Sequence, residues 1–114
     1  DKPLIYKITR SYYSHLAISG LRIFEYTPGF CHAKMSVSDD IIATCGTINM
    51  DYRSLYHHFE CGCLMVESDA VLAIRDDFED IFAKSNEVTE KYRSGRSAVL
   101  RFGQLLLRVA APLL

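Results

Sequence analysis

The stretch that most constrains the fold is residues 68–82, where apolar side chains recur every three or four positions between charged ones. This spacing predicts an amphipathic helix that begins after Ser68 as its N-cap. Its apolar positions are Val71, Leu72, Ile74, Phe78, Ile81 and Phe82, and its acidic run at 76–80 is expected to face solvent. Because an apolar stripe of this kind must be buried against another layer, the helix requires a partner surface.

The segments before this helix can supply that surface. Alternating or β-branched patterns predict strands at residues 21–26, 30–37, 41–45 and 59–67, with a hairpin turn at Ser38-Asp39-Asp40. A first helix is expected over residues 6–19 with Gly20 as its stop, and residues 85–97 are expected to be a polar link. The sequence therefore predicts an α/β fold, with a mixed β-sheet flanked by helices.

Size and charge limit the function classes. A chain of 114 residues with 49% hydrophobic residues is large enough for one core. It has 13 Lys and Arg against 14 Asp and Glu, a balance that gives no general attraction to nucleic acid. From Lys91 onward there are five cations and no acid. We therefore divide the chain into a main domain over residues 1–90 and a basic amphipathic tail over residues 91–114.

The tail allows two interpretations. If residues 97–111 are helical, Arg101 and Arg108 line one side and leucines lie toward the other. That pattern is typical of a helix lying on an anionic membrane surface. It equally suits packing against another part of a longer protein, which the absence of an initial methionine leads us to expect. No apolar run reaches the roughly 18 residues of a membrane span, and no signal peptide is recognised.

The four cysteines are expected to be free thiols. None of the intervals among Cys31, Cys45, Cys61 and Cys63 has the two-residue spacing of a structural zinc site, so no metal is expected. Burial as small hydrophobic side chains is the simplest interpretation, and a reducing, cytosolic compartment fits it.

One segment carries residues suited to phosphoryl chemistry. His32 and Lys34 are two apart, and on a strand they would share a face about 7 Å apart, close enough to grip one phosphate. Neutral imidazole can attack phosphorus, or imidazolium can protonate a leaving alkoxide. The ammonium of Lys34 can stabilise phosphoryl oxygens. An acceptor must hold the second nitrogen of the imidazole, and Asp39 or Glu60 could do so.

The loop at residues 46–55 adds polar groups. Thr47 and Asn49 follow Gly46 and can bind phosphate oxygens, so they are the predicted phosphate ligands together with Lys34. Asp51 and Arg53 could form a structural ion pair or contact a lipid headgroup.

These residues together resemble the phospholipase D superfamily. His32, Lys34 and Asp39 match its H-x-K-x4-D motif, Gly46-Thr47-Ile48-Asn49 looks like its G-[ST]-x-N element, and Glu60 matches as well. The segments EYTPGFCHAKMSVSDD and ATCGTINMDYRSLYHHFE narrow the resemblance to the C-terminal half of bacterial cardiolipin synthases. The resemblance implies that Glu60 orients His32 and that Asp39 braces the loop. It also implies that the chain is one half of a phospholipase D-type pseudo-dimer.

The resemblance implies a reaction as well. One histidine takes the phosphatidyl group from phosphatidylglycerol as a phosphohistidine, and the histidine of the other half protonates the departing glycerol. A second phosphatidylglycerol then attacks, which yields cardiolipin without a metal or an organic cofactor. His32 could be either histidine, and its place in a second motif favours the general acid.

The expected partners are phosphatidylglycerol, an anionic membrane surface on the cytoplasmic side of a bacterial cell, and the missing N-terminal half. Two other functions stay open. One is a phosphodiesterase that acts as a homodimer through this single motif. The other is a phosphate- or lipid-binding module without turnover, which the isolated chain could be even if the parent protein is an enzyme.

Overall fold

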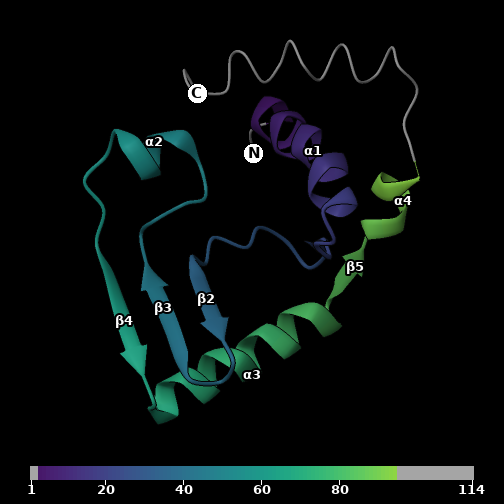
Figure 1. Cartoon of the computed structure of the whole chain (residues 1–114). Coiled ribbons are helices and arrows are strands. Elements are labelled where there is room, and N and C mark those ends of the chain that lie inside the picture. Colours follow the sequence, from purple (N-terminus) through teal and green to yellow (C-terminus); the bar gives the residue numbers. More distant parts are fainter. Residues whose placement is uncertain (1–2, 95–114) are drawn as a thin grey trace. The chain divides into compact units, whose positions relative to one another are not determined.

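The computed structural model describes residues 3–94, with side chains from Ile5 onward (Figure 1). The chain divides into two compact units, one made of residues 1–25 and 87–114 and the other of residues 26–86. The predicted tail helix at residues 97–111 lies outside the described residues. Among the described helices, none has the length and apolar character to cross a membrane.

The first unit is built around helix α1 (Pro3–Ile18). Proline as the first helical residue suits its fixed φ, and the helix ends where the sequence predicts. The amide of Gly20 donates to the carbonyl of Ala17, and that of Leu21 donates to Leu16, both over 3.1 Å. These two bonds form a Schellman motif, and Gly20 has the positive φ of 95° that the motif requires.

The link expected at residues 85–97 is wrong in its first part. Residues 85–87 form strand β5 (Ser85–Glu87), and helix α4 (Thr89–Arg93) packs on α1. Tyr92 is fully buried, with its ring edge-on to that of Tyr13 at 5.1 Å. Residues 85–97 are mostly polar and contain one aromatic residue, Tyr92, so they show no apolar repeat. Burial of that one tyrosine is enough to anchor the short helix.

The second unit contains a three-stranded antiparallel sheet in the order β2-β3-β4. Its strands are β2 (Met35–Ser38), β3 (Ile42–Gly46) and β4 (Gly62–Val66). The predicted hairpin is confirmed, with Ser38 opposite Ile42. The strand predicted for residues 30–37 starts only at Met35, so the predicted strand geometry of His32 and Lys34 is wrong.

Helix α3 (Asp69–Ala83) packs on one face of this sheet, toward the end where β2 turns into β3 (Figure 1). Ser68 occupies the N-cap position as predicted. Ala43 in the central strand and Val71 in the helix are fully buried. On the opposite face, Leu64 and Val66 are more than half exposed, so that face has no cover within the described chain.

The remaining strand is β1 (Phe24–Tyr26), shorter than the predicted 21–26. It pairs with β5 in a two-stranded sheet, where the chain passes from one unit to the other. The α/β class with helices flanking the sheets is confirmed.

Candidate functional site

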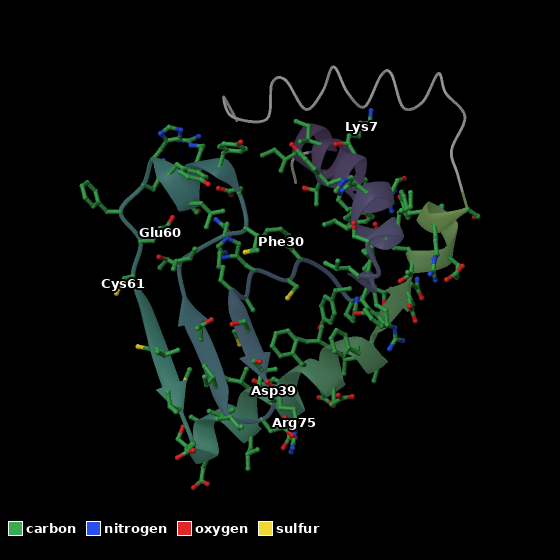
Figure 2. The ribbon with its side chains drawn as sticks, viewed as in Figure 1. Lys7, Phe30, Asp39, Glu60, Cys61 and Arg75 are labelled. Carbon is green, nitrogen blue, oxygen red and sulfur yellow. The ribbon has the colours of Figure 1, made fainter. Side chains whose placement is uncertain are left out.

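The H-x-K-x4-D residues fall at the two ends of β2. Lys34 immediately precedes the strand, and its carbonyl accepts the amide of Gly46 over 3.1 Å. Asp39 immediately follows the strand, at the hairpin turn. Figure 2 shows Asp39 near Arg75, at the other end of the sheet from Glu60. The structure therefore does not bring Asp39 together with the rest of the motif.

The turn explains why an aspartate suits position 39. Asp39 and Asp40 have φ of 54° and 57°, and the amide of Ile41 donates to the carbonyl of Ser38 over 3.0 Å. Two successive positive φ values define a type I′ turn, in which Asn, Asp and Gly are the favoured residues. Arg75 of α3 forms an ion pair with Asp40 over 3.2 Å. Asp39 therefore lies in a turn that α3 contacts.

His32 and Lys34 lie in the loop that leads into β2. The ammonium nitrogen of Lys34 donates to the carbonyl oxygen of His32 over 2.8 Å, so the cation lies beside the histidine backbone. The exposed imidazole ring stacks at a tilt on Phe30, with 5.4 Å between ring centroids. The Lys34 ammonium therefore contacts the His32 backbone, while the imidazole ring contacts Phe30.

Four polar side chains, Thr47, Asn49, Ser54 and Glu60, form what we call the polar cluster, and Thr47 and Glu60 are at its centre. The hydroxyl of Thr47 lies 2.5 Å from Glu60 Oε2 and 3.2 Å from the carbonyl oxygen of Cys61. It also accepts the amide of Cys61 over 3.0 Å, and the Thr47 amide donates to the Cys61 carbonyl over 2.9 Å. The strand pairing of β3 with β4 thus continues past Gly46 and fixes Thr47 against Glu60.

Ser54 is a member of this cluster that the sequence reasoning missed. It is buried in the short helix α2 (Tyr52–Tyr56), and its hydroxyl accepts the Asn49 side-chain amide over 3.3 Å. Its own amide donates to Asp51 Oδ1 over 2.8 Å, which makes Asp51 the N-cap of α2. The Asp-x-x-Ser spacing is a capping signal that could have revealed this helix.

Hydroxyl groups hold Glu60 in its charged form. Hydrogen bonds from Thr47 and then from Ser54 lower the pKa of Glu60 below its ordinary value. A carboxylate that stays ionised can act as the acceptor for an imidazole N–H. Within residues 5–94, however, no hydrogen bond joins Glu60 to His32, so the orienting role stays a prediction.

The narrow approach of β3 to β4 depends on Gly46. A methyl group on Gly46 would lie 2.6 Å from the Gly62 Cα and still closer to the Cys61 carbonyl oxygen. Only glycine permits the backbones to come this close, which is the reason that a glycine precedes Thr47.

The four cysteines are free, as predicted, but the expectation of burial is wrong. Cys31, Cys45, Cys61 and Cys63 are all exposed in the described chain. Cys45 and Cys63 lie opposite each other in the sheet, and Cys61 directly follows Glu60 in the sequence.

The segment that joins Thr47 to Glu60 carries several exposed apolar side chains. Six large ones are more than one third exposed, and Met50 and Phe59 are almost completely so. They are Ile48, Met50, Tyr52, Leu55, Tyr56 and Phe59. Exposed apolar side chains gathered on one segment are typical of a surface that contacts another apolar body.

The chain matches known proteins over its full length. A family model described as "Cardiolipin synthase, PLD-like domain" matches residues 1–82. An uncharacterized protein of Streptococcus mutans is 40% identical over 114 residues, all of this chain and 25% of its own length. Cardiolipin synthase 1 of Staphylococcus aureus is 35% identical over the same 114 residues and 23% of its length. Cardiolipin synthase 2 of Bacillus cereus is 32% identical, over 22% of its length.

The chain thus spans about a quarter of the length of these relatives. No solved structure matches it. Since the family model covers more than half of the chain, and the relatives align with all of it, the chain belongs to the cardiolipin synthase, PLD-like domain family.

Proposed function

We propose that this chain is the C-terminal catalytic half of a phosphatidyltransferase that makes cardiolipin from two molecules of phosphatidylglycerol. The observation that carries the proposal is the Thr47–Glu60 contact, which directly follows the pairing of Gly46 with Lys34, in a chain of the cardiolipin synthase family. Phospholipid is the substrate class that the relatives' names suggest. The other half of the site comes from another part of the protein or from a second copy.

The reaction transfers one phosphatidyl group. An imidazole nitrogen attacks phosphorus, and the bond from phosphorus to the glycerol oxygen breaks as a second imidazolium gives that oxygen a proton. A glycerol hydroxyl of the second lipid then loses its proton to that imidazole and attacks the phosphohistidine. Cardiolipin and a free imidazole result.

The residues of this half divide the work. His32 is the general acid or the nucleophile, and Lys34 supplies positive charge to the phosphate oxygens as charge develops on them. Thr47 and Asn49 contribute further donors to the phosphate. Glu60, kept ionised by Thr47 and Ser54, accepts from the imidazole once the ring turns toward it.

The exposed apolar segment between Thr47 and Glu60 supports a lipid substrate. A phosphate-binding cluster bordered by Met50 and Phe59 suits a headgroup with acyl chains attached. The charge balance of 13 cations against 14 acids does not suit nucleic acid. We place the parent protein at the bacterial membrane because its proposed substrate is a lipid. We place it on the cytoplasmic side because four free thiols suit a reducing compartment.

The test is cardiolipin formation by the intact protein in phosphatidylglycerol vesicles. His32→Ala should lower the rate by about 10²–10⁴-fold, the usual contribution of one general acid or base. His57→Ala is the matched control, because His57 is an exposed histidine outside the cluster. Equal rates for the two variants would overturn the proposal.

A phosphatidyl ester with a nitrophenolate leaving group separates the two roles of His32. Nitrophenolate leaves without a proton, so a general acid is not needed for its release. If His32 is the general acid, His32→Ala retains a burst of nitrophenolate equal to one turnover. If His32 is the nucleophile, the burst is lost.

A further inference from the structure

The three strands of the sheet place three sulfur side chains opposite one another. Met35 pairs with Cys45 across β2 and β3, and Cys45 pairs with Cys63 across β3 and β4. Residues directly opposite in a sheet share a face, so the three form one row, which we call the sulfur row. Cys45 and Cys63 are both exposed. The row is therefore open to a ligand.

The neighbouring row shows where the sulfur row lies. Two residues further toward the turn, Val37, Ala43 and Met65 stand opposite one another on the same face. Ala43 is fully buried there, on the face that α3 covers. The sulfur row is thus the first row beyond that buried one, on the side toward Lys34 and Thr47.

The spacing of the two thiols favours a bridging ion over a disulfide. The Thr47 amide donates a hydrogen bond to the Cys61 carbonyl, and hydrogen-bonded pairs recur every second residue in antiparallel strands. Cys45 and Cys63, two residues further along each strand, are therefore also a hydrogen-bonded pair. Such pairs have Cβ atoms about 5.5 Å apart, whereas a disulfide needs about 3.5–4.5 Å. Two thiolates that share an ion at about 2.3 Å each have sulfurs about 4 Å apart, a separation that side chains with Cβ atoms about 5.5 Å apart can span.

The third ligand decides the kind of ion. Met35 and Cys45 form a non-hydrogen-bonded pair, the type in which side chains stand closest, because the hydrogen-bonded position is Lys34 opposite Gly46. Its thioether adds a soft ligand to two soft thiolates, and this set selects Cu(I) over harder ions. Within residues 5–94, no three His, Cys, Asp or Glu side chains form a metal-binding group, so a harder donor set does not compete.

We propose that Met35, Cys45 and Cys63 form a binding site for a soft monovalent metal ion of the Cu(I) class. Binding replaces two thiol protons, which are released to solvent, by one ion held between two thiolates and a thioether. The bound ion joins β3 to β4 next to the Thr47–Cys61 pairing, about 7 Å along the strands. Occupancy therefore stiffens the sheet beneath the polar cluster.

The test compares two double variants of the intact protein that keep the same number of thiols. Cys31→Ser with Cys61→Ser keeps the sulfur row, and Cys45→Ser with Cys63→Ser removes it. Both are titrated with Cu(I) without oxygen, against a chromogenic Cu(I) chelator. The first should bind one Cu(I) about 100-fold or more tighter than the second, since two ligands on adjacent strands act together.

Equal affinities in the two double variants would overturn the proposal. All four serines replace exposed side chains, and hydrogen exchange of the β3 and β4 amides checks that both variants keep the sheet. Met35→Leu, which conserves volume, should weaken Cu(I) binding about tenfold. An unchanged affinity in Met35→Leu would overturn the part assigned to the thioether.

Discussion

Replacement of Gly46 by alanine tests whether the close approach of β3 to β4 holds the polar cluster together. The added methyl would lie 2.6 Å from the Gly62 Cα. Because carbon atoms in contact prefer about 3.5–4.0 Å, the strands must separate by about 1 Å. Overpacking of this kind costs about 1–3 kcal/mol, and it acts where Thr47 pairs with Cys61.

Gly62→Ala is the matched control on the opposite strand. Its methyl would lie 3.6 Å from the Cys45 carbonyl oxygen and 3.8 Å from Ile48 Cδ1, both ordinary contacts. Alanine is favoured over glycine in a strand by about 0.5–1 kcal/mol, so this variant should be neutral or slightly stabilised. The same substitution therefore has opposite effects on two glycines that face each other.

The measurement is hydrogen exchange of the Thr47 amide, which donates to the Cys61 carbonyl over 2.9 Å. A local loss of about 2 kcal/mol corresponds to roughly 30-fold faster exchange in Gly46→Ala than in Gly62→Ala. Exchange of this one amide reports on the β3–β4 pairing by itself. Equal exchange in both variants would refute the idea that the glycine is needed for close approach.

Three further predictions concern charge and turn geometry. Thr47→Val should raise the pKa of Glu60 toward its ordinary value because the hydroxyl that stabilises the carboxylate is lost, whereas Thr47→Ser should not; NMR titration of the Glu60 carboxyl carbon checks this. Hydrogen bonds from Arg22 and then from Thr89 lower the pKa of Glu87 from 4.5 to about 2, so the stabilisation is present above pH 4.5 and is lost as the pH falls through about 2. Glu87→Gln should flatten the acid unfolding curve over that interval. Asp39→Gly should leave the stability of the hairpin unchanged, while Asp39→Val should lower it by about 1–2 kcal/mol in urea unfolding because a β-branched residue resists a φ of 54°.

Periodicity was enough to predict the helix that begins after Ser68 and the hairpin at Asp39. In both cases the signal is local, since a cap or a turn residue stands beside an apolar repeat. The region before Met35 was mispredicted because its strand-like pattern has no partner to pair with. Gly46 is the last residue of β3 that pairs with this region, through the Lys34 carbonyl. The next residue, Thr47, pairs with Cys61 on the other side, so the residues just before Lys34 have no strand beside them in the described chain. A strand needs a neighbour, and the sequence of one segment does not show where its neighbour ends.

The polar cluster shows the same limit. Thr47 and Glu60 were predicted as site residues from their spacing, and the structure places them in contact. Ser54 was missed because a serine inside a polar loop has no pattern of its own. Its importance arises from burial and from its place between Asn49 and the N-cap Asp51. Contacts of this kind depend on the fold of α2 and not on residue type.

The spacing of the H-x-K-x4-D motif acquires a structural meaning here. The four residues between Lys34 and Asp39 are the whole of β2, Met35–Ser38. At about 3.3 Å per residue they separate the lysine from the aspartate by about 16 Å. The length of β2 thus fixes two features, the cation of Lys34 before the strand and the positive-φ turn at Asp39 after it. Deletion of one residue from β2 would move Lys34 out of register with Gly46, so the lysine would lose its place next to Thr47 even with every residue of the motif still present.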